Sequence, residues 1–363
     1  MQRSILQASR NWFRNAATHL VDAIRWHASA EIEIGAGVVA CLGFVGPILL
    51  AALFGQISLG IAASTGSLLV DGFVVGRTLG AQLKTLALRL APAFLAMIIA
   101  TALAASPTYS NAAVVLVSAF AATIGGYSRD MAIATTRFTL FVIITLSVAT
   151  TTSHHAALVV LLAMAALWTA ALWILFGFAI RRVRPLTDEE PELPQISRAD
   201  RSRRWLNSLR TIAGWRYTMR LSGCLAVAEA INIAWPQHHF HWIALTVAIL
   251  TQRTVSSEVK LIQRVLGAFV GAIGAVVFLA VNPSAWLLTL GIGLIAAARP
   301  LLKSRHYLSY TALMTTLIVL MADVGVRSTT DLLVDRVVAT MIGAALVIVV
   351  DTIVSRLTPS RLP

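Results

Sequence analysis

The chain has 363 residues, of which 58% are hydrophobic and only 12% are charged, and its mean hydropathy is +0.79. A soluble domain carries about 25% charged residues because its surface faces water, so this composition excludes a soluble protein and indicates a surface that faces lipid. The formal charge is +13, but the basic residues lie between apolar runs and form no extended basic face, which excludes a nucleic-acid-binding protein. The sequence has no phosphate-binding glycine loop, nucleophile motif or metal-ligand spacing, so it predicts no enzyme, cofactor or metal site.

The first 33 residues combine arginines with apolar residues at near-helical spacing, among them Trp12, Phe13, Leu20 and Ile24. This pattern is typical of an amphipathic helix that lies at the membrane surface. The stretch lacks a compact apolar region with a small-residue cleavage site, so we do not interpret it as a signal peptide.

Twelve apolar runs follow, and a helix needs about 20 residues to cross a hydrocarbon core of about 30 Å. The sequence therefore predicts an all-α polytopic membrane protein with about twelve transmembrane helices. Several runs of the second half are shorter than this length and need shielding by neighbouring helices. The runs cover residues 34–55, 57–75, 86–105, 111–127, 131–150, 156–180, 221–235, 240–252, 265–281, 284–298, 307–322 and 332–354.

The basic residues predict the orientation of these spans. With the N-terminus on the cytoplasmic side, 27 of the 29 lysines and arginines lie in or beside cytoplasmic segments, and only Arg327 and Arg336 lie near the outer face. Positive charge is retained on the cytoplasmic side of membrane proteins. Both termini are therefore expected to be cytoplasmic.

The two halves of the chain carry the same pattern, an Arg-Thr pair followed by Lys after five further residues, at an offset of 253 − 77 = 176 residues. Corresponding loops lie on the same side, so each repeat has an even number of spans, which indicates a parallel repeat of six helices. The equivalent pairs are Arg77 and Arg253, Lys84 and Lys260, Pro107 and Pro283, and Arg129 and Arg305.

The expected domain organisation follows from this repeat. Residues 1–33 form a cytoplasmic amphipathic segment, 34–180 the first membrane repeat, 218–357 the second, and 358–363 a cytoplasmic tail. Residues 181–217 contain prolines and charges of both signs, which is typical of a solvated linker.

The second half contains the stretch HWIALT at residues 241–246, then Gln252-Arg253, and then RVLG at residues 264–267. This arrangement resembles the core of the fusaric acid resistance (FUSC) family. Arg253 stands where the family commonly has proline, and Ala268 stands where it has threonine. The first half resembles the family only through its repeat.

The resemblance implies a protein of the bacterial inner membrane that is related to exporters of small aromatic carboxylic acids, such as fusaric or hydroxybenzoic acids. Such exporters often work with a periplasmic adaptor, and the plant malate channels are similar in architecture. The expected partners are therefore the lipid bilayer, a small organic anion and a periplasmic adaptor protein.

Charged side chains within a span are costly, at about 2.5–3.5 kcal/mol each, and therefore indicate a role. Asp71, Glu229 with Asn232 three residues later, and Asp351 are candidates for proton coupling, because a buried carboxylate can bind and release a proton. The alternative is a structural ion pair for Asp71 and for Asp351.

The basic loops contain candidates for an anion-attracting cytoplasmic mouth, because clustered positive charge concentrates anions. Their alternative role is to hold the loops inside and contact lipid headgroups. The candidates are Arg77, Lys84, Arg89, Arg253, Lys260 and Arg264.

Three functions are consistent with these features. Proton-driven efflux of small aromatic or organic carboxylic acids requires both the buried acids and the basic mouth. A passive organic-anion channel requires only the basic mouth, and a membrane scaffold or assembly partner requires neither.

Overall fold

The computed structural model describes residues 34–70, 78–105, 107–149, 155–183, 197–238, 240–251, 258–303, 305–322 and 329–357. These ranges contain helices and turns and no strand, which confirms the predicted all-α class. The expected amphipathic segment at residues 1–33 and the tail at 358–363 lie outside the described residues.

The helices follow the predicted apolar runs. In the first half they are α2 (Ile34–Ala52), α3 (Ile57–Ser64) with its 3₁₀ continuation η1 (Thr65–Val70), α4 (Leu79–Ala104), α5 (Pro107–Ile124), α6 (Arg129–Ala149) and α7 (His155–Val183). In the second half they are α9 (Ile212–Ala234), α10 (His241–Leu250), α11 (Glu258–Ala280), α12 (Ala285–Lys303), α13 (Tyr307–Ala322) and α14 (Thr329–Leu357). The expected linker contains a further helix, α8 (Arg198–Leu209), which the sequence did not predict.

Local side chains explain where several helices begin and where the chain turns. The hydroxyls of Thr78, Ser197 and Thr211 each accept a hydrogen bond from the backbone N–H three residues on, at 3.1, 3.1 and 3.3 Å, and so begin α4, α8 and α9. Gly55 after α2 and Asn282 after α11 adopt positive φ angles of 69° and 47°, which glycine and asparagine tolerate best.

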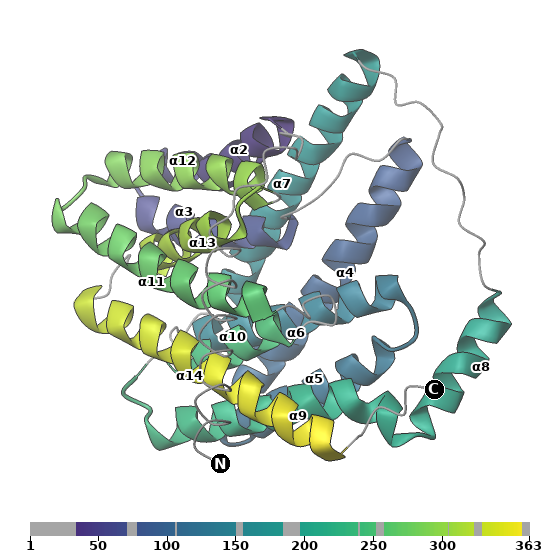
Figure 1. Ribbon diagram of the computed structural model, residues 1–363. Helices are drawn as coiled ribbons and strands as arrows, with labels where there is room; N and C mark the ends of the chain where they lie inside the picture. Colours follow the sequence, from purple (N-terminus) through teal and green to yellow (C-terminus); the bar gives the residue numbers. More distant parts are fainter. Residues whose placement is uncertain are drawn as a thin grey trace, which may run out of the picture.

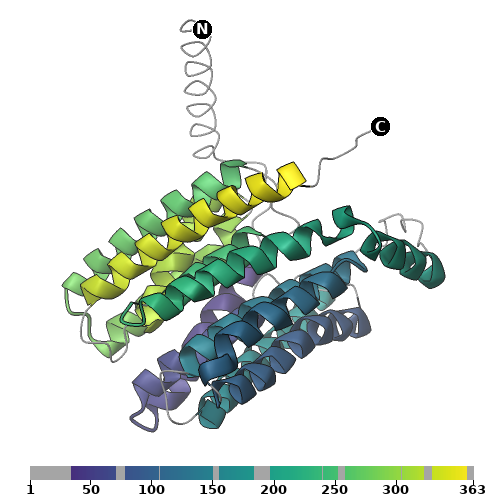
Figure 2. The same cartoon turned by 90° about the horizontal axis from the view of Figure 1, so that it is seen from below.

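The two halves of the chain form two adjoining layers (Figure 2). Helix α2 of the first half packs on α12 of the second half, and α9 of the second half packs on α5 of the first. Small residues allow a close approach between α2 and α12, because a Cβ on Gly37 would lie 2.9 Å from the carbonyl oxygen of Ala297, and one on Gly293 would lie 2.7 Å from Val45. The first helix of each half is thus held by the other half.

Seven helices are long and apolar enough to cross a membrane: α2, α4, α6, α7, α11, α12 and α14. Four shorter apolar helices accompany them, at residues Ile57–Val70, Tyr109–Ile124, His241–Leu250 and Tyr307–Met321. Large apolar side chains are exposed on the outer faces, for example Ile98 on α4 and Val277 on α11. A broad exposed apolar surface fits contact with lipid. The exact arrangement of twelve spans stays a prediction.

Helix α10 lies in the middle of the second half, where α9, α14 and α6 contact it (Figure 1). Eight of its ten residues are buried, including Trp242, Ile243 and Thr246. Ten residues extend only about 15 Å, half of the hydrocarbon core. Neighbouring helices therefore shield α10, and its ends lie within the protein.

Glycines of α11 allow a close approach to α13. A Cβ on Gly267 would lie 2.7 Å from the carbonyl oxygen of Leu308, and one on Gly271 would overlap the backbone of Ala312. The hydroxyl of Thr316 donates a hydrogen bond of 2.9 Å to the carbonyl oxygen of Gly271. Such small-residue contacts let helices associate closely in membranes.

We expect Gly271→Ala to lower the melting temperature in detergent, because the added methyl group overpacks the contact with α13 at a cost of about 1–3 kcal/mol. Gly80→Ala is the matched control, since a Cβ there meets nothing within 4 Å. Alanine favours a helix over glycine by about 1 kcal/mol, so the control should be neutral or stabilising. Equal shifts in the two variants would contradict the close packing.

Candidate functional site

Glu229 is a buried carboxylate on α9, with 7% of its surface exposed. Asn232, one turn further along the helix, hydrogen-bonds its side chain, and within the described residues Glu229 forms no ion pair. The contact of 3.3 Å between the hydroxyl oxygens of Thr123 and Thr218 sets the register of α9 against α5. A buried charged carboxylate with one amide partner is costly, and binding a proton removes that cost.

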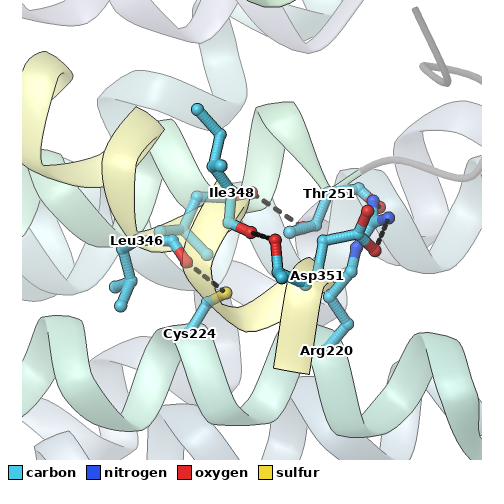
Figure 3. Close-up of polar contacts among 8 residues, drawn as sticks. Arg220, Cys224, Thr251, Leu346, Ile348 and Asp351 are labelled. Carbon is cyan, nitrogen blue, oxygen red and sulfur yellow. Dashed lines mark hydrogen bonds and ion pairs between the residues drawn. The ribbon is translucent and has the colours of Figure 1, made fainter. Parts of the chain in front are cut away.

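Asp351 on α14 takes part in a structural contact between three helices (Figure 3). The Arg220 guanidinium of α9 donates to its Oδ1 at 3.0 Å, and donates from its other terminal nitrogen to the carbonyl oxygen of Thr251 at 3.2 Å. Arg220 therefore joins α9 and α14 to the C-terminal end of α10. The Asp351 side chain is 44% exposed and is paired with Arg220, which fits the structural ion pair that was the alternative to a transport role. Asp71 lies outside the described residues.

Four of the six basic candidates lie within the described residues. Lys84 is exposed on α4, Arg89 is half-buried on the same helix, and Arg264 of α11 is buried, with 6% of its surface exposed. Lys260 lies in α11, whereas Arg77 and Arg253 lie outside the described residues. Arg264 therefore differs from the expected mouth residue, because it points into the protein.

Arg264 lies within electrostatic range of a second buried arginine, Arg336 of α14. Arg336 has 1% of its surface exposed, and its guanidinium carbon lies 4.4 Å from the centre of the Trp242 ring. Its Nε and one terminal nitrogen have no hydrogen-bond partner among the described residues. The ring attracts the cation by about 2 kcal/mol when water is excluded, whereas burying a charge costs several kcal/mol. These two like charges are therefore not balanced by the described side chains.

The N-terminal end of α10 lies beside this arginine pair, because Trp242 is in the first turn of that helix. The residue before the helix, Phe240, provides no side-chain cap for its backbone N–H groups. The positive end of a helix dipole stabilises an anion. The helix end and the two arginines thus both favour a negatively charged ligand.

The neighbouring carboxylate already has a partner. Asp335 of α14 contacts Nδ1 of His238 at 2.8 Å, and the His238 ring stacks on Phe240 with ring centres 4.9 Å apart. Asp335 is buried, whereas 44% of the His238 side chain is exposed. This contact attaches the loop between α9 and α10 to the N-terminal part of α14.

Arg336 was not among the predicted site residues, because its charge was counted with those near the outer face. Its signal was present, since Arg336 lies inside the apolar run at residues 332–354, where an arginine is costly. Arg299 was harder to recognise, because it directly follows the apolar run at residues 284–298. In the structure it is fully buried, and its guanidinium carbon lies 5.5 Å from the centre of the Phe44 ring.

Apolar helices around a buried cationic site define this chain as a multi-pass α-helical membrane protein. A model of the family described as fusaric acid resistance protein-like matches residues 223–350, which confirms the family that the sequence motif predicted. The matched segment contains Glu229, Trp242, Arg264 and Arg336. The family is one of transporters and not of enzymes. Comparisons with curated proteins and with solved structures each gave no match.

The melting temperature should respond differently when methionine replaces Arg336, which has no described counter-charge, and when it replaces Arg220, which is paired with Asp351. Arg336→Met should leave the melting temperature in detergent unchanged or raise it, because it removes a buried cation that Arg264 repels. Arg220→Met should lower the melting temperature, because it leaves Asp351 and the Thr251 carbonyl without their donor. A large destabilisation by Arg336→Met would show that Arg336 has a structural counter-charge.

Proposed function

We propose that the protein exports small organic carboxylates, aromatic acids among them, across the bacterial inner membrane, and that protons drive this export. The observation that carries the proposal is the buried pair Arg264 and Arg336, of which Arg336 lies over the ring of Trp242. The match to a transporter family, which includes this site, supports the same class of function.

The chemistry of the site fits an aromatic carboxylate. Arginine binds carboxylates through paired N–H donors, and Arg336 has two buried nitrogens without a hydrogen-bond partner among the described residues. The Trp242 ring, which lies against Arg336, gives the site an apolar aromatic wall. An anion between Arg264 and Arg336 would also remove their mutual repulsion.

The helix contacts support the proposed architecture of two parallel six-helix repeats with cytoplasmic termini. Helices α4 and α11 end at Ala104 and Ala280, which differ by 280 − 104 = 176 residues, the offset of the sequence repeat. The contact of α4 with α6 corresponds to that of α11 with α13, and the contact of α2 with α12 corresponds to that of α9 with α5. The partition of basic residues supports the orientation.

Glu229 is the proposed proton-coupling residue, because it is buried and forms no ion pair among the described residues. Asn232 holds its side chain. Lys84 and Arg89 are proposed to attract substrate on the cytoplasmic side. A periplasmic adaptor is a further proposed partner, and it rests on the family resemblance.

The proton-coupling step predicts a specific loss. Proteoliposomes with an acidic interior should accumulate labelled 4-hydroxybenzoate, whereas passive entry of the protonated acid would exclude it from that interior. Glu229→Gln should abolish this accumulation and retain exchange between equal concentrations. Asp351→Asn is the control, because its carboxylate is half-exposed and paired with Arg220, and it should accumulate substrate like the wild type.

Two outcomes would contradict this proposal. If the wild-type protein carries 4-hydroxybenzoate only down its gradient, the protein is a passive channel. If Glu229→Gln accumulates substrate normally, proton coupling does not depend on this residue.

The anion site predicts a second loss. Arg336→Met should reduce 4-hydroxybenzoate exchange by about tenfold or more per folded protein, which corresponds to about 1.4 kcal/mol of lost binding. Arg299→Met is the matched control, because Arg299 is also fully buried over an aromatic ring but lies on α12. Equal losses in both variants would show that any buried arginine is required for assembly.

A further inference from the structure

The linker helix α8 lies at the edge of the molecule, against the turn between α5 and α6 (Figure 1). The indole N–H of Trp205 donates to the carbonyl oxygen of Thr123 at 3.1 Å, and its ring meets the Tyr127 ring edge to face, with centres 6.0 Å apart. The Arg201 guanidinium lies 6.0 Å from the centre of the same Tyr127 ring. These contacts hold α8 in place although none of its residues is buried.

A pocket of about 470 Å³ opens between α8 and the start of α6. This volume is within the range of small-molecule sites, which is about 300–1,000 Å³. The pocket is lined by Arg129 of α6, by Arg201 and Arg204 of α8, and by the rings of Tyr127 and Trp205. One carboxylate, Asp130, also lines it, so the three arginines leave a net positive charge.

Two of the three arginines that line the pocket are accessible to a ligand. Arg129 and Arg204 are exposed, and neither forms an ion pair with a described residue. The 21-residue helix α6 begins at the pocket and adds the positive end of its dipole. Guanidinium groups bind phosphate oxygens through paired hydrogen bonds. The shape and charge therefore fit a phosphate group.

The surroundings of the pocket favour a phosphate at a membrane surface. Leu206 of α8 and Ile212 at the start of α9 are exposed apolar residues close to the pocket in sequence. The charge pattern places this end of the helices on the cytoplasmic side, where anionic lipids attract basic residues. We propose that the pocket between α8 and α6 binds a phosphate-bearing anion, with the headgroup of an anionic phospholipid as its source. This site is separate from Arg264 and Arg336 and does not depend on the transported substrate.

The proposal is tested by titrating the detergent-solubilised full chain with phosphatidylglycerol and, separately, with glycerol 3-phosphate, and by measuring binding. The variant Arg129→Gln/Arg201→Gln/Arg204→Gln should bind phosphatidylglycerol at least about tenfold more weakly. The variant Arg198→Gln/Arg203→Gln/Arg210→Gln removes the same charge from exposed arginines outside the pocket, and its affinity should remain within about twofold of wild type.

A variant that binds phosphatidylglycerol more tightly distinguishes an effect on the site from misfolding. Asp130→Asn removes the only carboxylate among the pocket-lining residues, so it should tighten phosphatidylglycerol binding by several-fold. Saturable binding of glycerol 3-phosphate that the pocket variant loses would support the phosphate site and assign it a soluble ligand. Equal weakening by both triple variants, or no saturable binding of either ligand, would overturn the proposal.

Discussion

Removal of polar groups from water is the constraint on which the second half of this structure depends. A helix that ends inside the protein leaves backbone groups that need partners there. The two ends of helix α10 differ in how these groups find partners. At its C-terminal end, Arg220 donates to the Thr251 carbonyl. At its N-terminal end, the nearby carboxylate of Asp335 is engaged by His238, and Arg336 over Trp242 keeps two nitrogens without a hydrogen-bond partner among the described residues. Arg336 thus has no described counter-charge, which is why an anion suits the site.

This constraint also separates the two kinds of charged residue in the fold. Arg220 and Asp351 neutralise each other, and this pair joins three helices at a position that is partly open to water. Arg264, Arg336 and Glu229 are buried without a described counter-charge. A protein does not retain such groups for stability, since apolar residues of similar volume are often more favourable. Their retention is therefore an argument for function.

Much of the fold could be predicted from apolar run lengths and charge, because lipid allows few alternatives to helices. The i, i+3 relation of Glu229 and Asn232 is local and was predictable. The position of Arg264 and its proximity to Arg336 were not, because residues 72 positions apart (336 − 264) meet only through tertiary packing. The linker helix α8 was also missed, since its composition is that of a solvated segment.

The contacts that the first helix of each half makes with the other half limit how this molecule can change shape. Because α2 is meshed with α12 and α9 lies on α5, neither half can separate from the other as an independent block. An opening toward one side of the membrane that keeps both contacts intact would have to tilt one half on the other. Helix α10, whose first turn carries the Trp242 ring next to Arg336, contacts α6 across the same boundary, so such a tilt would also act on the arginine site.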